Sequence, residues 1–407
     1  MRVMQVNVQI GSGSAGTIVV DLYKGIITNG DECQIAYSRG GIKGIPVQNT
    51  IKIGNKWDLY FHVLYSRLFG RTASYSKIET MKFLKKVDEY KPDIIHIHGI
   101  YGYYINMELF FEYIRNHNIK LVTTLHSCWD FTGHCCYFDS SGCMQWKNQC
   151  DKCPQKWSYP KSLFFEDSKK NLETKIRLYH QIDDAVLVSP SEWMDGIVSQ
   201  SNLKDIKHIV IHNGVDLNKF GPHIDMEYIN SLGINKDWPT ILSVASLWDR
   251  RKGLKDIYEM ANIYQTENIN FVVVGLSAEQ IKKKPRRIIG IKRTENLQQL
   301  ISLYTFSTVL FNPTYEDNYP TVNLESIACN TPVITYDTGG SGEIVLEYKM
   351  GTVVNKKDYE KVLSATFLFH KCKPILDEQL KIKLSSESMI HQYYQLYKTL
   401  ENSNHTC

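Results

Sequence analysis

The chain has 407 residues, of which 43% are hydrophobic and 22% charged, which is the composition of a globular protein of two or three domains. It contains no apolar run of about 18 residues, so no membrane-spanning helix is predicted. Its net charge of +4 is too small to indicate a nucleic-acid-binding protein. The N-terminus alternates like a strand and lacks the core of a signal peptide, so we expect a cytoplasmic protein.

A glycine-rich turn follows the first predicted strand, Val3–Ile10. It reads Gly11-Ser-Gly-Ser-Ala-Gly16, and the residues after it have the apolar spacing of a helix. Glycines at such a position let the backbone approach a ligand and point N–H groups at it. The pattern fits a ligand-binding turn and, equally, a simple tight turn, since the lysine of a P-loop is missing.

A stripe of large apolar residues runs along the predicted helix Lys56–Gly70, with Lys56 and Arg67 near its ends. The stripe consists of Trp57, Phe61, Leu64, Tyr65 and Leu68. Such stripes usually face the protein core, and that is the expectation here. The alternative is an amphipathic face that lies on the surface of the inner membrane.

Histidines mark the ends of the next predicted strands. Strand Ile94–His98 alternates, so His96 and His98 point to one face of the sheet. His126 follows strand Leu121–Leu125. A histidine at the C-terminal end of a parallel strand faces the ligand crevice, which favours a functional role for His126 over a packing role.

Six of the ten cysteines fall within the insert 128–157, interleaved with tryptophans. The pair Cys150 and Cys153 has the spacing of a zinc knuckle, and Cys135 and Cys143 could complete a four-thiolate site. Reduced core cysteines and disulfides are the alternatives. A structural zinc ion would explain how a helix-poor insert keeps its shape.

Strand–helix alternation restarts after Asn213-Gly214. Arg250, Arg251 and Lys252 lie in the loop between strand Thr240–Ala245 and the next predicted helix. Basic side chains at that sheet edge suit a diphosphate, because charge-assisted hydrogen bonds contribute roughly 1.5–3 kcal/mol each. A solvated basic loop is the alternative.

An acidic turn links strand Ser307–Phe311 to a helix that is predicted to begin at Pro320. The turn carries Glu316 and Asp317, and helix N-termini suit phosphate. The carboxylates suit the hydroxyls of a sugar and a ribose. The alternative is that this is an ordinary capped helix and that the acidic residues simply lie on the protein surface. The tail Glu387–Glu401 is predicted to be a tyrosine-rich helix.

These stretches resemble the retaining GT-B glycosyltransferases of glycosyltransferase family 4, and among them the colanic-acid-biosynthesis-like branch. The spacing Asp317-x7-Glu325 is similar to the family's paired acids, with Asp in place of the first Glu. Further stretches that carry the resemblance are Pro92–His98, Thr124–His134, the cysteine block through Pro154, Ile211–Asp216, Lys252-Gly253 and Thr338–Glu343.

The resemblance implies roles for individual residues. Lys252 would hold the donor diphosphate with Arg251, Asp317 would hold the hydroxyls of the transferred sugar, and Glu325 would hold the ribose. His126 would lie beside the sugar at the reaction centre. The donor would also contact the acidic turn and helix start, namely Asn318, Tyr319, Pro320 and Thr321. An N-terminal loop would close on phosphate and acceptor through Gly13, Ser14, Ala15 and Gly16.

We therefore predict an α/β protein with the GT-B fold, in which two doubly wound Rossmann-like domains face each other across a cleft. Residues 1–220 would form the acceptor-side domain, residues 221–385 the nucleotide-sugar-binding domain, and residues 386–407 a helix and tail that cross back to the first domain.

The predicted activity is transfer of a hexosyl group from a nucleotide diphosphate sugar to a lipid-linked saccharide, with retention and without a catalytic metal. The product would be a bacterial surface polysaccharide, and the protein would be cytoplasmic or peripheral at the cytoplasmic membrane face, with no nucleic-acid partner. A GT-B sugar-nucleotide 2-epimerase and a non-catalytic GT-B scaffold are the alternatives.

Overall fold

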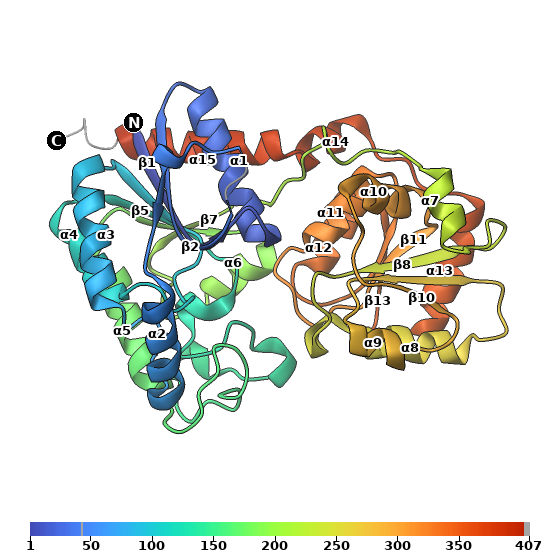
Figure 1. The fold of residues 1–407 in the computed structure, drawn as a ribbon, viewed down its shortest axis with the longest axis horizontal. Helices are drawn as coiled ribbons and strands as arrows, with labels where there is room; N and C mark the ends of the chain where they lie inside the picture. Colours follow the sequence, from blue (N-terminus) through green and yellow to red (C-terminus); the bar gives the residue numbers. More distant parts are fainter. Residues whose placement is uncertain (42–43, 403–407) are drawn as a thin grey trace. The chain divides into compact units, whose positions relative to one another are not determined.

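A computed structural model describes residues 1–41 and 44–402 (Figure 1). The chain divides into two compact units. Residues 1–212, together with the chain from residue 390 onward, form the first unit, and residues 213–389 form the second. In each unit a parallel β-sheet carries helices in its strand-to-strand connections.

The first unit is built on a seven-stranded parallel sheet with the order β3-β2-β1-β4-β5-β6-β7. Its strands are β1 (Arg2–Ile10), β2 (Glu32–Gly40), β3 (Thr50–Lys52), β4 (Ile94–Ile97), β5 (Lys120–Thr124), β6 (Ala185–Ser189) and β7 (Lys207–Val210). Its helices are α1 (Gly13–Thr28), α2 (Lys56–Phe69), α3 (Lys77–Tyr90), α4 (Met107–Asn116), α5 (Ser168–Tyr179) and α6 (Glu192–Val198).

The second unit is built on a six-stranded parallel sheet with the order β10-β9-β8-β11-β12-β13. Its strands are β8 (Thr240–Val244), β9 (Asn270–Val274), β10 (Ile288–Ile291), β11 (Val309–Asn312), β12 (Val333–Tyr336) and β13 (Gly351–Val354). Its helices are α7 (Met226–Ser231), α8 (Leu254–Ile263), α9 (Ala278–Lys283), α10 (Leu297–Phe306), α11 (Thr321–Ala328), α12 (Ser341–Tyr348), α13 (Tyr359–Lys371) and α14 (Glu378–Leu384).

Several strands are buried along their whole length, namely β4, β5 and β6 of the first sheet and β9, β11 and β12 of the second. Strand β4 pairs with β1 on one side and β5 on the other, with Ile95 opposite Met4 and Leu121. A strand that is covered on both faces is normally a continuous apolar run. Strand β4 departs from that pattern because it carries the buried His96, whose ring nitrogens bond to Tyr397 and Thr124.

Helix α15 (Ser386–Asn402) ends the described chain, and its residues from Ile390 onward belong to the first unit (Figure 1). Tyr393 and Tyr397 are fully buried there. Gly25 of α1 makes room for the helix, since a Cβ at that position would lie 2.2 Å from the Cγ2 atom of Ile390. The tail is therefore part of the first unit's core.

The predicted fold class is confirmed, since both units are parallel α/β domains. The expectation that the apolar stripe of α2 faces the core is wrong. Only His62 and Ser66 of this helix are buried, and the side chains of Trp57 and Phe61 are 73% and 56% exposed. Periodicity identified the stripe, but it could not tell which face of the helix meets the rest of the unit.

The cysteine-containing segment between β5 and α5 consists of short 3-10 turns, and its shape comes from packing. Trp129, Phe131 and Trp146 are buried in it, and the Lys175 ammonium donates to the carbonyl oxygens of Trp129 and Thr132 at 2.6 and 2.8 Å. Burial lowers the pKa of Lys175 to about 7.

The predicted zinc site at Cys135, Cys143, Cys150 and Cys153 is not confirmed. Cys135 and Cys153 share a hydrogen bond, and Cys150 accepts one from the backbone of Gly133 at 3.3 Å. Within residues 1–41 and 44–402, however, no three His, Cys, Asp or Glu side chains are grouped so that they could hold a metal ion, and no cysteine there is in a disulfide.

No helix in the part of the chain that the structure describes combines the length and the apolar character that a membrane crossing requires.

Candidate active site

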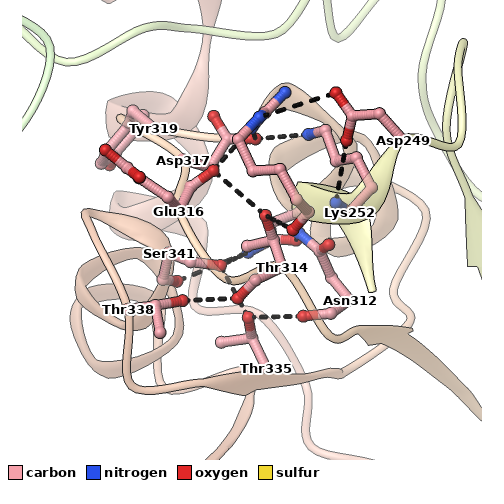
Figure 2. Close-up of polar contacts among 12 residues, drawn as sticks. Asp249, Lys252, Asn312, Thr314, Glu316, Asp317, Tyr319, Thr335, Thr338 and Ser341 are labelled. Carbon is pink, nitrogen blue, oxygen red and sulfur yellow. Dashed lines mark hydrogen bonds and ion pairs between the residues drawn. The ribbon is translucent and has the colours of Figure 1, made fainter. Parts of the chain in front are cut away.

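Three neighbouring strands of the second unit, β8, β11 and β12, end at one edge of the sheet. The loop after β8 carries the basic cluster, the loop after β11 carries the acidic turn, and the loop after β12 carries Gly339 and Gly340. Parallel strands place these loops together, because the C-terminal ends of adjacent strands lie side by side. Figure 2 shows the side chains that meet there.

The basic loop is a single 3-10 turn, Arg250–Lys252, whose ends are fixed. The Asp249 carboxylate accepts a hydrogen bond from the backbone N–H of Lys252 at 3.1 Å. Gly253 follows with a φ of 75° and is the N-cap residue of α8. A Cβ at Gly253 would lie 2.1 Å from the carbonyl oxygen of Pro313, so only glycine allows this loop to reach the acidic turn.

Lys252 and Arg251 both reach Asp317. The Lys252 ammonium donates to Asp317 Oδ2, while Arg251 Nη1 lies 3.4 Å from the same oxygen and 2.6 Å from the carbonyl oxygen of Glu316 (Figure 2). Burial opposes ionisation of Asp317, but the positive charges of Lys252 and Arg251 outweigh it and hold the pKa of this carboxyl below its ordinary value. The exposed Arg250 is not part of this cluster.

A buried polar network fixes the loops beneath the ion cluster. Asn323 on α11 accepts from Asn312 at 2.9 Å and donates to the hydroxyl of Ser341 at 3.0 Å. Thr338 donates to the carbonyl oxygen of Thr314 at 2.6 Å. Because buried polar groups are costly unless paired, these bonds hold the segments that follow β11 and β12 in one arrangement (Figure 2).

Helix α11 begins at Thr321, one residue later than predicted, and Pro320 is its N-cap. Among the described residues no side chain caps this N-terminus. The first backbone N–H groups of the helix are therefore not occupied by a capping side chain. Tyr319 is anchored beside it by a hydrogen bond from its hydroxyl to Glu347 at 3.1 Å. Asn318 is buried in the same turn.

Glu325 lies one turn further along α11 and is half-buried. The hydroxyl of Tyr304 donates to Glu325 Oε2 at 2.8 Å. Burial raises the pKa of Glu325 to about 7, although this hydrogen bond opposes the rise. The two acids of the spacing Asp317-x7-Glu325 therefore have opposite electrostatics: the first is ionised and ion-paired, and the second is close to half-protonated at neutral pH.

In the first unit the predicted residues lie at the C-terminal ends of β1 and β5. Helix α1 begins at Gly13, so Gly13, Ser14 and Gly16 form its first turn. The glycines at 11, 13 and 16 have the spacing G-x-G-x-x-G. A Cβ at Gly16 would lie 3.1 Å from the carbonyl oxygen of Gln9, which is the close helix–strand packing that the third glycine of this motif allows.

His126 lies two residues beyond β5, and its ring is partly exposed. Its Nε2 atom is 3.1 Å from Nδ1 of His98, and His98 Nε2 is 3.0 Å from Oε1 of Gln5. Burial lowers the pKa of His126 to about 4, so its ring is neutral at pH 7. The sequence predicted the position of His126 but not these partners.

The geometry fits the families that the chain matches. The family model described as "Glycosyltransferase Family 4" matches residues 15–219, just over half of the 407 residues. The chain belongs to this family. A second model, "Glycosyl transferases group 1", matches residues 225–379 and so covers the ion cluster.

Relatives of this glycosyltransferase match either nearly the whole chain or part of it. The putative colanic acid biosynthesis glycosyl transferase WcaC of Escherichia coli is 22% identical over 98% of this chain and 100% of its own. The N,N'-diacetylbacillosaminyl-diphospho-undecaprenol alpha-1,3-N-acetylgalactosaminyltransferase of Campylobacter jejuni is 27% identical over 46% of this chain and 50% of its own. The solved structure of HepE from Anabaena, in complex with UDP, has a TM-score of 0.62 at 13% identity and covers 98% of this chain and 100% of its own.

Sequence reasoning about the glycosyltransferase missed the residues that support the ion cluster. Asp249 caps the basic loop, and Asn323 and Ser341 join the loops beneath it. Asp249 could have been found, since an Asp three residues before Lys252 has the spacing of a cap. Asn323 and Ser341 lie 18 residues apart and carry no local signal of their contact.

Proposed function

We propose that this glycosyltransferase transfers a sugar, with retention, from a nucleotide diphosphate sugar to a hydroxyl of a lipid-linked saccharide in the synthesis of a bacterial surface polysaccharide. The main observation in support of the donor site is that Lys252 and Arg251 both lie against Asp317. Two cations and one carboxylate at a sheet's C-terminal edge suit a ligand with an anionic diphosphate and a neutral hydroxylated sugar.

The second unit is assigned to the donor. Lys252 and Arg251 bind the diphosphate, and the uncapped start of α11, from Asn318 and Tyr319 through Pro320 and Thr321, faces the same charge. Once a diphosphate binds Lys252 and Arg251, Asp317 is released to accept hydrogen bonds from hydroxyls of the sugar. Glu325 accepts a hydrogen bond from a hydroxyl of the ribose. A half-buried carboxyl suits this role, because a neutral hydroxyl adds no charge to the site. HepE, whose structure contains UDP, supports a nucleotide donor.

The bond that breaks joins the sugar to the diphosphate, and negative charge develops on the departing phosphate. Lys252, Arg251 and the N–H groups of α11 stabilise that charge from fixed positions. Removing one such donor of a preorganised site typically lowers a rate by about 10²–10³-fold. Because these groups supply the stabilisation, the proposed reaction proceeds without a catalytic metal.

The first unit is assigned to the acceptor. The first turn of α1, with Gly13, Ser14 and Gly16, points backbone N–H groups beyond the end of β1. His126 at the end of β5 is assigned to the sugar at the reaction centre. The names of two relatives support the acceptor class: one is a putative colanic acid biosynthesis glycosyl transferase, and the other is named for a diphospho-undecaprenol saccharide.

A lipid-linked acceptor requires the enzyme to work at a membrane surface, and the first unit has a suitable face. We define the aromatic surface as Trp57, Tyr60, Phe61, Leu64, Tyr65 and Phe69 of α2 with Trp157, Phe164 and Phe165 of the segment 157–165, all of them exposed. The two parts are joined by hydrogen bonds from the N–H groups of Leu163 and Phe165 to the carbonyl oxygens of Arg67 and Leu68 at 2.7 and 3.1 Å.

Basic side chains lie among these rings. Lys156 and Lys161 lie 5.0 and 5.7 Å from the centre of the Trp157 ring, and Lys56 and Arg67 are exposed on α2. Aromatic rings interleaved with cations are typical of a surface that inserts among anionic lipid headgroups. We therefore propose that the enzyme is peripheral at the cytoplasmic face of an anionic membrane.

A donor screen tests the proposal. Thermal unfolding is recorded with UDP-, GDP-, ADP- and dTDP-sugars, with the Lys252→Ala variant as the control. One nucleotide class should raise the melting temperature of the wild-type protein, since binding at 100 times Kd adds about 2.7 kcal/mol of stability. The variant should lose most of that shift. If no class shifts the wild-type protein, or if the variant shifts equally, the donor site is misassigned.

A further inference from the structure

A chain of three hydrogen-bonded side chains leads from α1 to His126, which is partly exposed. Gln5 lies on β1, His98 directly follows β4, and His126 lies just beyond β5, so the three residues come from adjacent strands of the sheet. Gln5 is fully buried and His98 is 3% exposed. Each contact is a normal hydrogen bond of 3.0 or 3.1 Å.

The direction of these bonds follows from the first one. The side-chain amide of Gln5 donates to the backbone carbonyl oxygen of Val19 at 3.1 Å. A carbonyl can only accept, so the NH₂ group of Gln5 must face Val19 and Oε1 must face His98. His98 Nε2 therefore carries a proton and donates it to Gln5 Oε1 at 3.0 Å.

The next bond follows in the same way. His98 is fully enclosed, and burial holds its pKa well below its ordinary value, so the ring has one proton only. With that proton on Nε2, Nδ1 of His98 must accept. Its partner is Nε2 of His126 at 3.1 Å, which must then donate. His126 is left with an unprotonated Nδ1.

We infer that Gln5 and His98 are positioning residues that fix the tautomer of His126, so that this ring presents Nδ1 as a hydrogen-bond acceptor and not as a donor. Neither residue has to touch a ligand to act in this way. Proteins commonly determine the tautomer of a histidine in this way: a buried partner bonds to one ring nitrogen and thereby decides whether the other nitrogen carries a proton.

A neighbouring network provides an internal control. His96 bonds to Tyr397 at 2.6 Å and to Thr124 at 2.8 Å, and Thr124 bonds to Tyr393 at 2.8 Å. These hydrogen bonds do not involve Gln5, His98 or His126, although the His96 ring packs on the His98 ring with 3.9 Å between their centres. The variant Thr124→Val breaks that network in the same layer of the sheet while sparing the three side chains of the chain to His126.

The test is nuclear magnetic resonance of protein with ¹⁵N-labelled histidine, which shows which ring nitrogen carries the proton and detects coupling across an N–H···N bond. In the wild-type protein His126 should be protonated at Nε2 and coupled to His98 Nδ1. The variant Gln5→Met removes the acceptor for His98 Nε2–H at similar volume. His98 should then carry its proton on Nδ1 and donate to His126 Nε2, which moves the His126 proton to Nδ1.

The control Thr124→Val should leave the His126 tautomer as in the wild-type protein, and thermal melting shows that each variant is folded. The inference is overturned if wild-type His126 is protonated at Nδ1, or if folded Gln5→Met leaves its proton on Nε2.

A kinetic comparison relates the inference to the proposed function, on which this last step rests. If His126 acts at the reaction centre, Gln5→Met should lower kcat for transfer by at least about tenfold with KM for the donor nearly unchanged, as a wrong tautomer does elsewhere. A tautomer that moves while kcat stays constant would support the positioning and would remove His126 from the proposed mechanism.

Discussion

Lys252 is the residue on which the proposed donor site depends most directly, since its ammonium reaches Asp317 from a loop that Asp249 caps and Gly253 ends. The variant Lys252→Ala should lower kcat/KM for transfer by about 10²-fold, because a charge-assisted bond contributes roughly 1.5–3 kcal/mol. Steady-state kinetics measures this. Lys255→Ala is the matched control: its side chain is 84% exposed and pairs only loosely with Glu259 at 3.5 Å. Equal kinetics for the two variants would contradict the assignment.

Glu325 gives the protein a pH-dependent stability. Its pKa is raised by burial from an ordinary 4.5 to about 7, so the folded state holds the proton more tightly than the unfolded state. The contribution of Glu325 to stability is therefore largest below pH 4.5, falls as the pH rises to about 7, and levels off above that. The neutral variant Glu325→Gln should match the wild-type protein at low pH.

Above pH 7 this variant should be more stable, by on the order of 2 kcal/mol once partial exposure is taken into account. Urea unfolding of both proteins from pH 4.5 to 8 measures the difference. Curves that stay parallel over this range would show that Glu325 titrates in the folded protein as it does in the unfolded chain.

At the scale of elements, α2 is notable because it is held by few contacts. Asn55 caps it by accepting from the N–H groups of Trp57 and Asp58, and His62 bonds to Ser76 at 2.7 Å, while most of its apolar side chains remain exposed. Together with segment 157–165 it forms the aromatic surface, which includes the stacked pair Phe69 and Phe165.

The double variant Trp57→Ser, Phe164→Ser should reduce binding to vesicles that contain phosphatidylglycerol by at least tenfold, because burying one such ring contributes roughly 1.5–3 kcal/mol. Co-sedimentation measures the bound fraction. Binding should weaken with salt, since the basic side chains contribute. Ile375→Ser, at a residue 89% exposed in the second unit, is the control. Equal binding to uncharged vesicles would contradict the proposed preference for an anionic membrane.

Most elements could be predicted where the apolar periodicity and the flanking turn-forming residues indicate the same bounds. Strands β1, β4, β5 and β8 lie within one residue of their predicted bounds at each end, because each is a short apolar or alternating run between turn signals. The exposure of α2 could not be predicted, because an amphipathic pattern is the same whether the apolar face meets a core or a membrane. Nor could the shape of the cysteine segment be predicted, because it depends on Lys175, a residue outside it.

The same distinction holds for the site. Local spacing was enough to locate Lys252, Asp317 and His126 at sheet edges. The contact between Gln5 and His98 spans 93 residues, and no local pattern encodes it.

At the scale of the molecule, the first unit is not continuous in sequence, because it is completed by α15. A chain that ends at Met389 would lose Tyr393 and Tyr397, both fully buried, and the bond from Tyr397 to His96. Removing one large buried aromatic ring typically costs about 3–5 kcal/mol, and a domain's whole stability is about 5–15 kcal/mol. The truncated chain should therefore fail to fold its first unit.

Calorimetry should then show a single transition for the truncated chain, from the second unit, and limited proteolysis should leave a fragment near residues 213–389. The control is Gln395→Ala on the exposed side of α15. A first unit that melts at its usual temperature without α15 would show that the tail contributes little to its core.

The salt bridge between Lys252 and Asp317 has a consequence for the catalytic cycle of the proposed enzyme. Between turnovers the lysine already has a resident counter-ion, so an incoming diphosphate must displace the carboxylate. This exchange weakens capture of stray inorganic anions. After transfer, the carboxylate competes for the same lysine and helps to expel the spent nucleotide. One side chain thereby limits product inhibition from within the site.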